Sequence, residues 1–173
     1  RVGDFSYIFT HPFGFIRILL NFFAYHIGGL NPTFFRLINY GFHLGSVFLI
    51  YAILNALYNK RVAFIAAVIF AVHPGISEAV VWISGGTYPQ YTFFFLLSFL
   101  LYIFGKENKR GYWISVAIFA LTFMSHPGMP LALFLIFPLY ELCFGDLKKN
   151  WVKSVPFFIV TLVNVFIDIS ALP

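Results

Sequence analysis

The chain has 173 residues, of which 61% are hydrophobic, 22% aromatic and 10% charged, with a formal net charge of +5. Soluble domains contain roughly 45–50% apolar and 25% charged residues, so this composition excludes an ordinary soluble fold and predicts a polytopic membrane protein. The single cysteine, Cys143, excludes a disulfide framework and a cysteine-based metal site.

The chain starts at Arg1 without a signal peptide and is expected to be an internal fragment of a longer protein. It contains no linker, low-complexity tract or short-period repeat. We therefore expect residues 1–173 to form part of one membrane domain, with an external loop over 1–31 and a transmembrane bundle over 32–173.

The first predicted element covers residues 11–28. Arg17, Asn21 and Tyr25 recur every four residues among Phe, Ile and Leu, and Gly28 ends the segment. This pattern predicts a helix lying in the outer membrane interface. The alternative is an ordinary spanning helix.

Apolar runs separated by polar connections then predict about six spanning helices, so the predicted fold class is an all-α polytopic bundle. A full crossing needs about 20 residues. The second and fourth runs are short for this length. The six predicted runs cover residues 32–57, 62–73, 88–105, 112–125, 129–145 and 154–171.

The basic residues predict how these helices are oriented. Eight of the eleven Lys and Arg residues lie in three alternate connections, whereas the connections "HPGISEAVVWISGGTYP" and "SHPGMP" contain none. The positive-inside rule places the basic connections in the cytoplasm and the His-Pro connections in the non-cytoplasmic compartment. The basic residues concerned are Lys60, Arg61, Lys106, Lys109, Arg110, Lys148, Lys149 and Lys153.

The outer half of the run 32–57 contains a polar stripe made of Arg36, Asn39, Tyr40 and His43. Offsets of three, four and seven residues place these side chains on one helix face. Polar groups are costly in hydrocarbon, so this face is expected to line a cavity that opens outward. The alternative is that Asn39 and His43 only bond to neighbouring helices.

The segment "FAVHPGISEAVVWISGG" places a carboxylate beside apolar sequence. Pro74 ends the preceding helix and biases His73 away from helical angles, so a short external helix can follow. Glu78 and Trp82 are four residues apart and share its face. A carboxylate beside an aromatic ring suits sugar binding. The alternatives are a solvated Glu78 and a Trp82 that anchors the membrane interface.

Four other polar residues have weaker interpretations. His73 and His126 could bind a metal, but no third ligand is indicated and no metal site is predicted. Asp168 either faces the outward cavity or marks a helix end. Glu141 is expected to be a snorkelling or paired carboxylate close to Lys148 and Lys149.

Three stretches are similar to a known family. "GLNPTFFRLINYGFHLGSVFLIY" resembles a family segment G-L-N-P-x-x-F-H-L-x-N-x-x-x-H. "AAVIFAVHPGISEAVVWISGG" resembles A-x-x-F-x-x-H-P-x-x-x-E-x-V-x-W, and "MSHPGMPLALFLIFPLYELCF" resembles a segment ending in P-L-L-L-x-x-Y-D-L. Over residues 11–145 the chain therefore resembles the GT-C membrane glycosyltransferases, in particular the protein O-mannosyltransferases and the transmembrane-plus-tetratricopeptide O-mannosyltransferases.

The resemblance implies a polyprenyl- or dolichyl-phosphate-linked sugar donor, no other cofactor, and transfer on the non-cytoplasmic face. In the family, the catalytic acid lies in the first external loop. Asp4 is the acid that this chain has there, and no motif around Asp4 identifies it as the base. The chain departs from the family pattern at three places. Arg36 stands where the family usually has His, Gly85-Gly86 lies where relatives commonly have Arg, and His126-Pro127 replaces a Lys-Glu pair. By the resemblance, the substrate-binding candidates are Asn39, His43, His73 and Trp82, with Glu78 in a positioning role.

The predicted function is thus that of an integral-membrane glycosyltransferase fragment. Arg17 and Arg36 are the external cations available to hold a phosphate. The expected partners are membrane lipid, the lipid-linked sugar and a protein or glycan acceptor, with no nucleic acid. The alternatives are a transporter or flippase subunit for a lipid-linked solute and a catalytically inactive relative.

Overall fold

The computed structural model describes residues 14–125 and 131–170, and these residues form helices with no strand. The all-α fold class is therefore confirmed. Asp4, His11 and the His126-Pro127 turn lie outside the described residues. The helices are α2 (Phe15–Gly28), α3 (Pro32–Leu57), α4 (Lys60–Val72), α5 (Pro74–Val81), α6 (Thr87–Gly105), α7 (Lys109–Ser125), α8 (Ile136–Phe144) and α9 (Leu147–Ser170), with short 3₁₀ helices η1 (Ile83–Gly86) and η2 (Leu131–Leu135).

Within residues 14–125 and 131–170, three helical segments are long and apolar enough to cross a membrane, namely 32–57, 83–105 and 147–170. A fourth crossing is possible if α4 and α5, which are bent by 54° at their junction, count as one broken span. The helices α7 and α8 occupy two further predicted runs but are shorter. The number of crossings, predicted as six, stays a prediction.

The helix boundaries follow from local chemistry. Asn59 caps α4, because its side-chain oxygen accepts from the backbone N–H groups of Arg61 and Val62, each at 3.0 Å. His73 has extended backbone angles, and Pro74 occupies the first turn of α5, as the sequence predicts. Gly29 ends α2 with a φ of 61°, which favours glycine.

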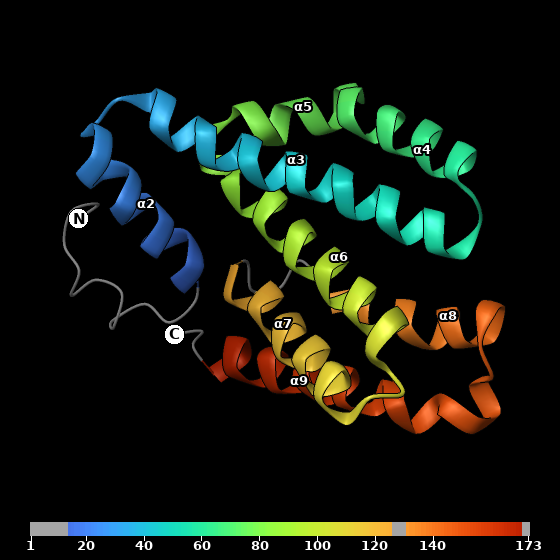
Figure 1. Cartoon of the computed structure of the whole chain (residues 1–173). Helices are drawn as coiled ribbons and strands as arrows, with labels where there is room; N and C mark the ends of the chain where they lie inside the picture. The colour runs from blue at the N-terminus through green and yellow to red at the C-terminus, as the bar shows by residue number, and fades with distance from the viewer. Residues whose placement is uncertain (1–13, 126–130, 171–173) are drawn as a thin grey trace.

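The bundle has two layers that meet at α6 (Figure 1). Helices α3, α4 and α5 lie on one side of α6, and α7, α8 and α9 lie on the other, while α2 packs against α3 and α7. The three basic connections, between α3 and α4, α6 and α7, and α8 and α9, lie at one end of the bundle.

The core of the second layer is aromatic. Phe137 and Phe157 stack with ring centroids 3.6 Å apart, and Tyr102 and Phe119 pack edge-on against them. These rings are buried and join α6, α7, α8 and α9. Edge-to-face ring pairs contribute beyond area burial, so this cluster fixes the relative positions of the four helices.

Candidate functional site

An open pocket lies where the start of α3 meets the end of α5. Its volume is about 540 Å³. Arg36 reaches it from the second turn of α3, and Glu78 and Trp82 reach it from α5 and the residue after it. Its lining residues are Arg36, Glu78, Val81, Trp82, Ile83 and Ser84. A cation, a carboxylate and an indole therefore border one opening.

Glu78 and Trp82 also border a neighbouring pocket of about 310 Å³, together with Gly75, Ala79 and Tyr88. Their backbones are joined, because the Trp82 N–H donates to the Glu78 carbonyl at 2.9 Å. Trp82 is 59% exposed. The pair thus stands between two openings, where it can contact a molecule in either of them.

Asn39 does not line this pocket. It is buried, and its Nδ2 donates to the backbone carbonyls of Val80 and Trp82, each at 3.3 Å. Gly86 faces this amide, and any Cβ there would lie 2.5 Å from the Asn39 side-chain oxygen. Asn39 therefore holds the end of α5 that carries Trp82 in place, which agrees with the alternative that it bonds to a neighbouring helix.

His43 is also directed elsewhere. Its Nε2 lies 3.2 Å from the carbonyl oxygen of Ala71, and its ring stacks on Phe70 with centroids 5.4 Å apart. It lines a pocket of about 190 Å³ with Ser46 and Tyr88. This pocket adjoins the Glu78 pocket of about 310 Å³, because Gly75, Ala79 and Tyr88 border both. The predicted polar stripe is thus divided: Arg36 faces the Glu78 pocket, whereas Asn39 and His43 tie α3 to α5 and α4.

The other predicted site residues lie apart from Glu78. His73 Nδ1 accepts from the Gly75 N–H at 3.1 Å, which caps α5. Arg17 is exposed in the first turn of α2 and Asp168 is half-buried near the end of α9; neither lines the pockets described here. Among the described residues, no three His, Cys, Asp or Glu side chains are grouped to hold a metal ion.

A second polar cluster surrounds Glu141 at the opposite end of the bundle. The Glu141 carboxylate is fully buried and accepts from Lys106 at 2.8 Å, from the Tyr102 hydroxyl at 2.9 Å and from Asn150 at 2.8 Å. The Asp146 N–H also donates to it, at 3.3 Å. Burial alone would lower the pKa of the Lys106 ammonium, but its hydrogen bond to Glu141 and the nearby Tyr140 raise that pKa above its usual value.

Glu141 is a paired carboxylate, as predicted, but the lysines expected close to it are not its partners. Its partner is Lys106, from the connection between α6 and α7, and not Lys148 or Lys149. Lys106 follows the apolar run 88–105, and Glu141 lies near the end of the run 129–145. Both ends point to the basic end of the bundle, and this is the signal that could have paired the two residues. The cluster joins α6, α8 and α9.

Comparison with known proteins defines the class. Residues 11–171 match the family model of the dolichyl-phosphate-mannose-protein mannosyltransferases. The chain therefore belongs to this family of membrane glycosyltransferases, and the resemblance to protein O-mannosyltransferases is confirmed.

Two curated relatives match parts of the chain. Protein O-mannosyl-transferase TMTC4 of Homo sapiens is 31% identical over 55% of this chain and 16% of its own length. Protein O-mannosyl-transferase TMTC1 of Mus musculus is 38% identical over 43% of this chain and 8% of its own length. The chain thus spans a small part of these relatives. No solved structure matches it.

Proposed function

We propose that the protein to which this chain belongs transfers mannose from a polyprenyl-phosphate-linked donor to a protein acceptor on the non-cytoplasmic face. The observation that carries the proposal is the pocket where Arg36, Glu78 and Trp82 meet. It lies in a chain of the mannosyltransferase family, at a distance from the basic connections. In this proposal the pocket positions the substrates, and the catalytic base lies elsewhere.

The three side chains have complementary roles for such a substrate. The Arg36 guanidinium can form two parallel hydrogen bonds to a phosphate, which suits the leaving group. Glu78 can accept hydrogen bonds from sugar hydroxyls, and the exposed Trp82 ring offers an apolar face for the sugar ring. The isoprenoid chain would stay in lipid beside the apolar wall formed by Val81 and Ile83.

The role of Arg36 can be tested in the full-length protein. Arg36→Gln is expected to raise the KM for polyprenyl-phosphate mannose about fivefold, because one exposed contact to phosphate is worth about 1 kcal/mol. The matched control is Arg61→Gln, which removes an exposed guanidinium from the basic end. Transfer is measured with a radiolabelled donor. An unchanged KM in Arg36→Gln, or no transfer by the wild-type protein, would contradict the proposal.

The proposed face can be tested separately by labelling single cysteines in a variant that lacks Cys143. Ser84 lines the pocket and is exposed, whereas Asn108 is exposed in the connection between α6 and α7. We expect a membrane-impermeant maleimide added to the non-cytoplasmic side to label Ser84→Cys and to leave Asn108→Cys unlabelled until the membrane is opened. Labelling of both cysteines from one side would refute this topology.

A further inference from the structure

A third opening lies at the basic end of the bundle, between α7 and α9 and beside the connection from α6 to α7. Its volume is about 470 Å³, which lies within the roughly 300–1,000 Å³ typical of small-molecule sites. It is separate from the Glu78 pocket and shares no residue with it. The lining residues are Lys106, Glu107, Lys109, Tyr112, Trp113, Val152, Lys153 and Pro156.

The lysines of this opening differ in what they bind. Lys106 is committed to the buried Glu141. Lys153 Nζ contacts the carboxylate of Glu107 at 2.8 Å, and the Glu107 side chain is 76% exposed. Lys109 is exposed and forms no ion pair with a described residue. One lysine is thus unpaired and a second is held by a surface carboxylate that an anion can replace.

The pKa of Glu107 reflects the same concentration of positive charge. The hydrogen bond from Lys153 and the charge of that lysine lower this pKa, and the charges of Lys106 and Lys149 lower it further. Glu107 therefore occupies a position where negative charge is favoured. A phosphate could take that position with stronger contacts, since it offers more acceptor oxygens.

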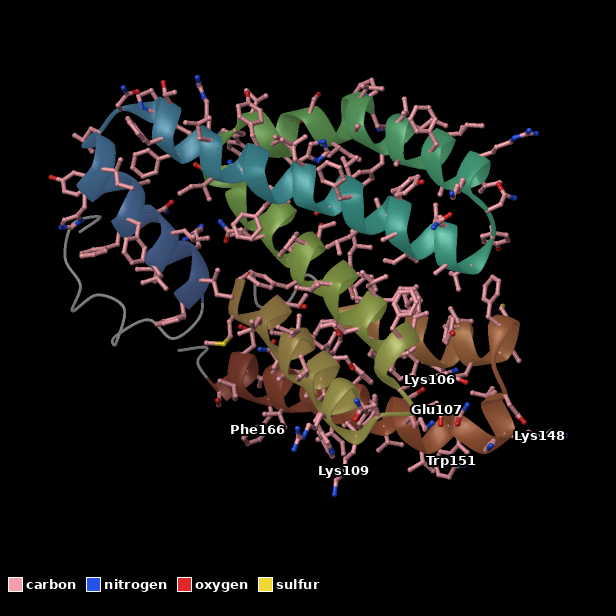
Figure 2. The ribbon with its side chains drawn as sticks, in the orientation of Figure 1. Lys106, Glu107, Lys109, Lys148, Trp151 and Phe166 are labelled. Atoms are coloured by element: carbon pink, nitrogen blue, oxygen red, sulfur yellow. The ribbon has the colours of Figure 1, made fainter. Side chains whose placement is uncertain are left out.

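Aromatic side chains place this opening at a membrane interface. Trp113 in its wall is 52% exposed and Trp151 on the adjacent face of α9 is 58% exposed. Figure 2 shows Lys106, Glu107 and Trp151 toward the lower right of the bundle and Lys109 below the start of α7, while Phe166 lies toward the other end of α9. Exposed Trp residues at the level of a lysine cluster are typical of the head-group region.

The walls of the opening combine a fixed polar frame with apolar surface. The Tyr112 hydroxyl donates to the backbone carbonyl of Lys153 at 3.0 Å, which holds α7 against α9. Pro156 lies inside α9 and has no N–H to donate to the carbonyl of Val152. Val152 is itself 57% exposed. An acyl chain can therefore continue along α9 from a head group bound at the lysines.

We propose that this opening binds the phosphate head group of an anionic phospholipid, with Lys109 and Lys153 as the cationic contacts and Trp113 at the glycerol level. Basic pockets between transmembrane helices bind anionic head groups in this way. Glu107 acts as the competing anion that a lipid must displace from Lys153. This inference is independent of the transfer reaction, and it concerns the end of the bundle away from Glu78.

The experiment uses the fluorescence of Trp113 in the full-length protein, with every other tryptophan, Trp82 and Trp151 included, replaced by phenylalanine. The protein is reconstituted in nanodiscs of unlabelled phosphatidylcholine. Increasing fractions of a brominated lipid are added, either brominated phosphatidylglycerol or brominated phosphatidylcholine. Bromine quenches an indole that it contacts. We expect the association constant of phosphatidylglycerol at Trp113 to exceed that of phosphatidylcholine roughly 25-fold, because each of the two lysines contributes about fivefold.

Charge variants then test the site itself. Lys109→Gln and Lys153→Gln are each expected to lower the preference for phosphatidylglycerol roughly fivefold. Lys153→Gln keeps the hydrogen bond from the Tyr112 hydroxyl, because its acceptor is the backbone carbonyl of residue 153. Glu107→Gln is expected to raise the preference, because it frees Lys153. The matched control is Lys148→Gln, an exposed lysine outside the opening that should leave the preference unchanged.

Four outcomes would overturn the proposal. The first is equal quenching by the two brominated lipids. The second is a loss of the preference for phosphatidylglycerol in Lys148→Gln as large as that in Lys109→Gln, because this result would indicate diffuse surface attraction. The third is recovery of fluorescence on adding soluble glycerol phosphate, which would indicate a site for free phosphate. The fourth is far stronger competition by polyprenyl phosphate than by unlabelled phosphatidylglycerol, which would assign the opening to the sugar carrier.

Discussion

Replacing Glu78 with glutamine in the full-length protein is expected to slow mannose transfer by roughly ten- to 150-fold, with some activity left. Glutamine keeps the shape of the side chain and removes its charge. One hydrogen bond to a charged group is worth about 1.5–3 kcal/mol, and about 1.4 kcal/mol corresponds to a tenfold change in rate. Glu78 is exposed in the free protein, but a bound sugar stacked on Trp82 would exclude water from it.

Two further carboxylate variants are compared with Glu78→Gln. Asp168→Asn removes a carboxylate that lines none of the pockets around Glu78 and is expected to leave transfer unchanged. The family resemblance implies a catalytic acid in a first external loop, for which Asp4 is the candidate in this chain. Replacing that acid is expected to cost more than Glu78→Gln. Full activity in Glu78→Gln would assign Glu78 to the solvated membrane boundary. A loss equal to that of the first-loop variant would make Glu78 a candidate base.

The short helix α5 could be predicted because its signals are local. Pro74 fixes where α5 begins, and the spacing of Glu78 and Trp82 depends only on helix geometry. The same holds for the end of α2 at Gly28. These features need no information on which helices are neighbours, so the sequence specifies them directly.

The division of the polar stripe could not be predicted, because it depends on which helix covers which face. Helical spacing places Arg36, Asn39 and His43 on one side of α3. The 54° bend between α4 and α5 then brings the Val80 and Trp82 carbonyls over Asn39 and leaves Arg36 open. The pairing of Glu141 with Lys106 was missed for the same reason, since 34 intervening residues separate them.

Lys106→Met is expected to lower the free energy of unfolding by about 3–5 kcal/mol, because it leaves the buried Glu141 carboxylate without its cation. The methionine stem is similar in length, so packing is largely kept. Unfolding is followed by circular dichroism during titration with sodium dodecyl sulfate in mixed micelles. The matched control is Lys148→Met, an exposed lysine without an ion pair to a described residue, which should change stability little.

The double variant Lys106→Met with Glu141→Leu separates charge pairing from other contacts. It removes both charges and is expected to lose less stability than the sum of the two single variants, since no uncompensated buried charge remains. Some loss should persist, because Tyr102 and Asn150 each lose an acceptor. If Lys106→Met costs no more than Lys148→Met, or if the two single losses simply add, Glu141 does not carry a charge that Lys106 stabilises. The junction of α6, α8 and α9 would then depend on its aromatic core and on the hydrogen bonds of Tyr102 and Asn150 to Glu141.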